Sequence, residues 1–146
     1  MERHLIYELH SLTARMDRSA DRLLMAECGL SYRRFLALLM LGELGTATQR
    51  ALAERMGVTE PSVSRTVGVL AEAGLLDLRP DPAGGNRRQL ALTADGKELV
   101  EKGQQLLELR FEQLIARSGV PYAVYAEHTR LLLEALEALD VSVQKR

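Results

Sequence analysis

The chain has 146 residues, a formal net charge of −1 at pH 7 and a single cysteine. One cysteine excludes an internal disulfide. The three histidines and the cysteine lack the spacing of a zinc site, so we expect no metal and no cofactor. No apolar run approaches the length of a membrane span and no signal peptide is apparent, which predicts a cytoplasmic protein without a membrane partner.

The N-terminal region predicts two helices. Leu5, Leu9 and Leu12 begin an apolar stripe at helical spacing, and this long helix is expected to end near Cys28. A second helix is expected after Ser31, which can cap it.

Two short helices separated by a tight turn are predicted next. The first, Gln49 to Met56, buries Leu52, Ala53 and Met56, and Gly57 ends it. A small residue at the crossing and a glycine in the turn suit two helices that cross closely. Such a pair is typical of proteins that read DNA.

The second helix of the pair begins after Thr59, a favourable N-cap, with Pro61 early enough to cost no internal hydrogen bond. Val63, Val67 and Leu70 form its apolar face. Short hydroxyls and an arginine on the other side suit contact with base edges in the major groove. The alternative is an ordinary solvated helix face. The candidate residues are Ser62, Ser64, Arg65 and Thr66.

A basic hairpin follows the helix pair. Leu75 to Arg79 alternates as a strand after Gly74, a predicted helix cap, and Gln89 to Leu92 is the returning strand. Arg87 and Arg88 stand near the tip, where arginines can enter the minor groove or contact phosphates. The alternative is a hairpin kept soluble by two arginines. Helix, turn and hairpin in this order predict a winged helix-turn-helix.

Charge is distributed unevenly along the chain. Arg50 to Arg88 holds six basic and five acidic residues, whereas Asp95 to Asp140 holds five basic and nine acidic residues. The acidic side chains are thus concentrated away from the predicted DNA-binding surface. We expect a modest number of phosphate contacts and an affinity that falls as salt rises.

The segment ALAERMGVTEPSVSRTVGVLAEAGLL and the hairpin ending in LALTADG resemble the MarR (multiple antibiotic resistance regulator) family over residues 30–100. Leu92, Thr93 and Gly96 match the end of the family's wing pattern, whereas Gly85 stands where the family carries an aspartate. The resemblance implies that Arg87 is the wing-tip contact with DNA, with Arg88 as the alternative. The full set of expected DNA contacts is Thr48, Gln49, Ser62, Ser64, Arg65, Thr66, Arg87 and Arg88.

Two helices are predicted beyond the wing. Thr93 can cap a helix to about Ala116, which Gly103 weakens, and a last helix follows Pro121. That helix is apolar on several sides, which predicts a partner subunit; the alternative is a helix buried within a monomer. The resemblance implies a two-fold homodimer built from N- and C-terminal helices. Its two reading helices would lie about 34 Å apart on a palindromic operator of double-stranded DNA.

The expected organisation is mainly α with a small β-hairpin wing. Residues 1–30 form an N-terminal dimerisation helix, residues 31–93 a DNA-binding lobe, and residues 94–146 the C-terminal dimerisation helices.

The resemblance also implies a pocket for a small aromatic or phenolic effector. His10 could bind an effector carboxylate, and the alternative is an ordinary boundary histidine. Cys28 could sense peroxide if nearby positive charge lowered its pKa, but Glu27 precedes it and no basic residue lies within four positions, which favours an idle thiol.

No nucleotide-binding, hydrolase or metalloprotease motif occurs, so the chain is not expected to be an enzyme. We interpret it as a sequence-specific DNA-binding regulator of transcription, acting as a repressor that a small molecule releases. The alternative is a winged helix that binds proteins and has no specific affinity for DNA.

Overall fold

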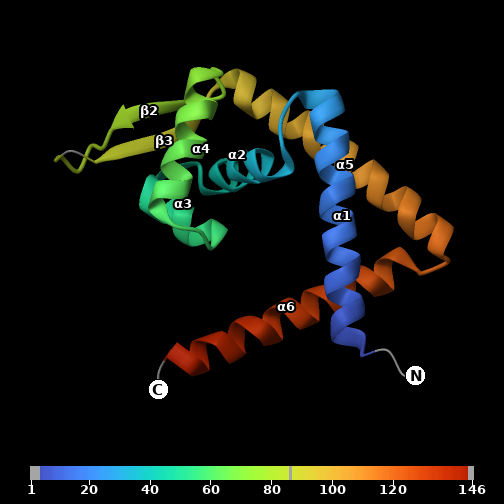
Figure 1. Cartoon of the computed structure of the whole chain (residues 1–146). Helices are drawn as coiled ribbons and strands as arrows, with labels where there is room; N and C mark the ends of the chain where they lie inside the picture. The colour runs from blue at the N-terminus through green and yellow to red at the C-terminus, as the bar shows by residue number, and fades with distance from the viewer. Residues whose placement is uncertain (1–3, 86, 145–146) are drawn as a thin grey trace. The chain divides into compact units, whose positions relative to one another are not determined.

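The computed structural model describes residues 4–85 and 87–144 (Figure 1). Contacts divide the chain into two compact units, one ending at Leu107 and the other beginning at Glu108. Each helix in the described residues is too short or too polar to be a candidate membrane span. The elements are α1 (Leu5–Cys28), α2 (Tyr32–Leu44), β1 (Thr46–Thr48), α3 (Gln49–Met56), α4 (Glu60–Glu72), β2 (Leu76–Pro80), β3 (Arg88–Leu92), α5 (Ala94–Ser118) and α6 (Tyr122–Gln144).

The first unit contains a three-stranded antiparallel sheet in the order β1-β3-β2. Strand β3 lies in the centre, and its Gln89 pairs with Thr48 of β1 on one side and with Arg79 of β2 on the other. The sequence predicted only the β2–β3 hairpin and missed β1, because three residues are too few to display an alternating pattern. The wing is therefore attached along β3 to the strand that precedes α3.

Local capping explains where the helices begin. The side chains of Ser31, Thr48 and Thr59 accept hydrogen bonds from backbone N–H groups in the first turns of α2, α3 and α4. Thr93 accepts from the Gly96 N–H at 3.0 Å at the start of α5. Each cap satisfies a backbone donor that a helix start leaves without an intrahelical partner.

Some predicted boundaries differ slightly from the structure. Ala73, and not Gly74, caps α4; Gly74 follows it at φ +75°, the left-handed conformation that glycine adopts without steric cost. Both wing strands include one residue more towards the tip than predicted, because Pro80 pairs with Arg88. Helix α5 continues to Ser118, two residues past the expected end.

One apolar core holds the first unit together. Leu38 and Leu41 of α2, Leu52 of α3, Leu70 of α4 and Leu90 of β3 are all fully buried within it. Each buried side chain of this size stabilises the fold by about 1.5–3 kcal/mol. The core thus fixes the helix pair and the sheet relative to each other, and the predicted mainly α winged helix-turn-helix fold is confirmed.

Two glycines of α5 allow close packing against the rest of the first unit. A Cβ at Gly103 would clash with the ring of Phe35, which is fully buried in α2. A Cβ at Gly96 would clash with the backbone carbonyl oxygen of Leu75. The same carbonyl accepts the Thr93 N–H at 3.2 Å. Gly103, which lowers the helix propensity of α5, is therefore required for packing against Phe35.

The second unit consists of the end of α5 and α6. The ring of Phe111 meets those of Tyr122 and Tyr125, with centroids 6.0 and 6.3 Å away. The Tyr122 hydroxyl donates to Glu108 at 2.6 Å, and this hydrogen bond raises the pKa of Tyr122. The other large apolar side chains of α6 are between 48% and 72% exposed. They are Val124, Leu131, Leu132, Leu133, Leu136, Leu139, Val141 and Val143.

We expect Gly96→Ala to destabilise the protein. Overpacking costs about 1–3 kcal/mol, and the contact is with a backbone oxygen that cannot move aside, so the cost exceeds the gain of about 1 kcal/mol in helix propensity. Gly68→Ala in α4 is the matched control, because a Cβ there meets nothing within 4 Å. Urea unfolding followed by circular dichroism measures both. A Gly96 variant as stable as the Gly68 variant would contradict the packing account.

Candidate nucleic-acid interface

Helix α4, here called the reading helix, begins at a fixed point and presents a polar side to solvent. The Ser62 N–H donates to the Thr59 hydroxyl at 3.3 Å, which caps the helix. Val63 and Val67 are buried in the core, so the intervening Ser64 and Arg65 are exposed. The predicted candidates thus occupy the first two turns of the helix, on and beside its exposed side.

Hydrogen bonds set which hydroxyls of the reading helix are free to donate. Thr66 Oγ1 donates to the Ser62 carbonyl at 3.2 Å, so its proton is used within the helix and it offers a methyl group and acceptor lone pairs. Ser62 Oγ accepts from Arg33 of α2 at 3.4 Å. The Ser62 hydroxyl therefore keeps its proton for an outside acceptor.

The start of α3 lies beside the wing because the strand before it, β1, pairs with β3 of the wing. Thr48 ends β1 and also caps α3, accepting the Ala51 N–H at 3.1 Å. The pairing of Thr48 with Gln89 brings Gln49 and Arg50 close to the first residues of β3. Two segments about forty residues apart in the chain are in this way joined at one surface.

The wing tip is organised by Asp81. Its backbone N–H donates to the Arg87 carbonyl, its carbonyl accepts from the Gly84 N–H, and its carboxylate accepts from the Ala83 N–H, each at 3.0 Å. Gly85 lies at φ +80°, where an L side chain is strained. Gly85, at the position where the family carries an aspartate, thus allows a tight turn. Asp81 instead forms the hydrogen bonds that hold the loop and Arg87.

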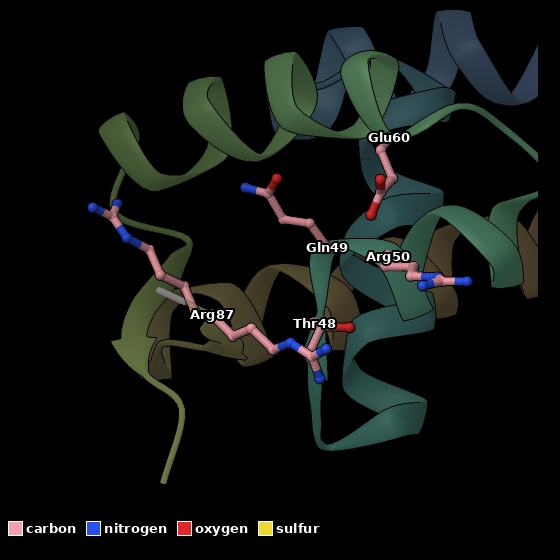
Figure 2. A pocket seen from close by; sticks show the side chains of 6 residues that line it. Thr48, Gln49, Arg50, Glu60 and Arg87 are labelled. Carbon is pink, nitrogen blue, oxygen red and sulfur yellow. The ribbon is translucent and has the colours of Figure 1, made fainter. Parts of the chain in front are cut away.

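These segments surround an open hollow of about 560 Å³. Figure 2 shows the side chains of Thr48, Gln49 and Arg50 from the β1–α3 junction and of Glu60 from the start of the reading helix around it, with Arg87 from the wing. Arg88 also lines it. Even with Arg50 paired to Glu54, the two arginines Arg87 and Arg88 outnumber the one lining carboxylate, so the hollow is electropositive and suits an anionic partner.

The arginines differ in how far other side chains neutralise them. Arg50 is paired with Glu54 at 3.3 Å and Arg79 with Asp77 at 3.4 Å, both in exposed positions. Among residues 4–85 and 87–144, no ion pair includes Arg65, Arg87 or Arg88. The charges of these three side chains are therefore available to an outside anion.

The predicted site residues fall into two groups. Thr48, Gln49, Arg87 and Arg88 line the hollow, whereas Ser62, Ser64, Arg65 and Thr66 lie on the reading helix. Arg50 and Glu60 also line the hollow and were not predicted as site residues. Their positions at two predicted helix starts were the available signal in the sequence, but the hollow itself depends on the unpredicted strand β1.

His10, the candidate effector ligand, and Cys28, for which the sequence favours an idle thiol over a peroxide sensor, do not line the hollow. His10 is exposed on α1, and Cys28, half-buried, ends the same helix. Across the described ranges, no three His, Cys, Asp or Glu side chains cluster in a way that could hold a metal ion.

A capped reading helix, a second helix packed across it and a basic β-hairpin wing define a winged helix-turn-helix protein. A model described as the MarR family matches residues 29–85, which contain the helix pair and most of the wing. An HTH-type transcriptional regulator of Mycobacterium leprae is 28% identical over 109 residues, 74% of this chain and 76% of its own length.

Solved structures agree on the fold. The apo form of wild-type MarR from E. coli superposes with a TM-score of 0.80 at 19% identity, covering 93% of this chain and 98% of the other. A mutant of the same protein complexed with operator DNA gives a TM-score of 0.76 at 20% identity, covering 90% and 93%. The chain is thus similar to the MarR family over residues 29–85 and to MarR in its fold, and its Mycobacterium leprae relative is a transcriptional regulator.

We expect Thr59→Ala to lower the free energy of unfolding by about 1 kcal/mol, because it leaves a backbone donor at the start of the reading helix without its cap. Thr59→Ser keeps the accepting oxygen and should retain most of the stability. Urea unfolding of the two variants measures the difference. Equal stability of both variants would show that the capping bond contributes nothing.

Proposed function

We propose that this protein binds double-stranded DNA in a sequence-specific manner through the reading helix. The observation that carries the proposal is Arg65, exposed on the outer side of a capped helix and in no ion pair with any residue that the structure describes, together with a hollow lined by Arg87 and Arg88. An arginine on such a helix can bind a guanine edge with two hydrogen bonds. The structure of E. coli MarR with operator DNA supports the proposal.

The reading helix and the hollow then have different tasks. Ser62, Ser64, Arg65 and Thr66 meet base edges and the walls of the major groove, and the methyl of Thr66 suits the methyl of thymine. Arg87, with Arg88 as the alternative, enters the minor groove or binds phosphate. Thr48 and Gln49 contact the DNA phosphate backbone beside the hollow. Phosphate contacts fix the position of the protein, whereas base contacts supply its specificity.

We further propose a two-fold homodimer. Leu132, Leu136 and Leu139 of α6 are 66%, 53% and 63% exposed in the single chain, and Leu5 of α1 is 68% exposed. Apolar surface of this extent on terminal helices favours a second copy as the cover. Residues 1–30 and 94–146 would form the dimer, with residues 31–93 as the DNA-binding lobe. Two-fold symmetry would require a palindromic operator.

In this proposal the protein acts in the cytoplasm as a repressor, and a small aromatic or phenolic effector releases it from the operator. Family resemblance supports both the repressor role and the effector. Exposed His10 on α1 is the proposed ligand of an effector carboxylate, because an imidazole N–H can donate a hydrogen bond to a carboxylate oxygen.

Arg65→Ala should weaken binding to the operator by about 1–3 kcal/mol and relax specificity at one base position. Arg117→Ala removes the same charge from an exposed site near the end of α5 and should change affinity little. Fluorescence anisotropy with duplexes from the DNA flanking the gene measures both. Equal affinities for the two variants would exclude Arg65 as a base reader, and no DNA binding by the wild type would favour the protein-interaction alternative.

Leu132→Asp should dissociate the dimer, because it places a charge in the apolar interface. Gln113→Asp adds the same charge at an exposed polar site and should leave the dimer intact. Light scattering after size exclusion at micromolar concentration should give twice the 16.2 kDa chain mass for the wild type and the control. A wild-type mass of one chain would contradict the dimer.

A further inference from the structure

Arg33 lies at a well-anchored position at the start of α2. The Tyr32 N–H donates to Asp21 Oδ1 of α1 at 2.9 Å, and the Arg34 N–H donates to Ser31 Oγ at 3.3 Å. These two bonds satisfy backbone donors on either side of Arg33. Its backbone is therefore held by both α1 and the cap of α2.

The guanidinium of Arg33 reaches the reading helix. Its Nη2 donates to Ser62 Oγ at 3.4 Å, across 29 residues of sequence, and the Ser62 N–H is itself held by Thr59. Within the described residues this is the one hydrogen bond found for the Arg33 side chain, which is exposed and takes part in no ion pair. A guanidinium has five N–H donors, so most of them remain available.

Arg33 and the hollow flank the first turn of the reading helix on different sides. Glu60 faces the hollow, and Ser62 follows two residues later, about 200° further around the helix. A helix in the major groove, which is about 12 Å wide, lies between the two phosphate backbones. The arginines of the hollow can approach one backbone, and Arg33 lies on the side of the other.

We propose that Arg33 is a DNA-phosphate contact, binding the backbone on the α2 side of the reading helix, and that it positions the Ser62 hydroxyl to donate to DNA. This inference rests on the proposed DNA-binding function. Ser62 Oγ accepts from Arg33 and so turns its own proton outward. The guanidinium and the hydroxyl then present donors side by side, an arrangement that suits the oxygens of one phosphate.

The charge and the hydrogen bond of Arg33 can be separated by substitution. Arg33→Lys keeps the charge, whereas Arg33→Gln keeps a donor for Ser62 and loses the charge. A lost phosphate contact makes the slope of log affinity against log salt shallower by about 0.9 for each Arg33 engaged. Loss of this contact also lowers the affinity for the operator and for a random duplex by a similar factor. We therefore expect Arg33→Gln to show both effects, and Arg33→Lys to keep the wild-type slope.

Salt-titrated fluorescence anisotropy of the full-length variants provides the measurement, with Arg117→Ala as the charge-matched control and circular dichroism to check folding. An Arg33→Gln slope equal to that of the wild type, while Arg65→Ala still lowers operator affinity, would overturn the phosphate contact and leave the proposed function standing. Absence of duplex binding by the wild type would overturn both. An Arg33→Lys slope as shallow as that of Arg33→Gln would also contradict the inference, since the charge is retained.

Discussion

The pairing of β1 with β3 is the constraint on which the rest of the interface depends. Thr48 is both the last residue of β1 and the cap of α3, so the strand that pairs with the wing also starts the helix pair. Ladder hydrogen bonds have a defined register, and a shift by one residue would turn every side chain to the other face of the sheet. This register sets the distance between the wing arginines and the start of α3.

The core transmits that constraint to the reading helix. Leu90, in the central strand, is buried together with Leu52 of α3 and Leu70 of the reading helix. Because protein interiors are close-packed, these three elements cannot slide independently. The polar side of the reading helix and the arginines of the wing therefore face solvent as one surface. Arg33 adds a third element to that surface, from the start of α2.

The elements that were predictable from sequence have local causes. Caps such as Thr59 and Ser31 act within three residues, and the turn at Gly57 needs only its own backbone conformation, so these boundaries could be predicted closely. Strand β1 could not, because its three residues are stabilised by a partner about forty positions away. The bond from Arg33 to Ser62 and the contact of Gly103 with Phe35 are equally non-local. The candidate DNA contacts could be named, but not their arrangement around the hollow.

Sequence-specific DNA binding is tested most directly by the affinity of the wild-type protein for DNA flanking its own gene, compared with a random duplex of equal length. Fluorescence anisotropy between about 50 and about 200 mM salt covers the range in which phosphate contacts dominate. Sequence-specific binding through the reading helix and the arginines should give a clear preference for one palindromic site and an affinity that falls linearly on logarithmic axes as salt rises. Equal, weak binding to both duplexes at the lowest salt would contradict it.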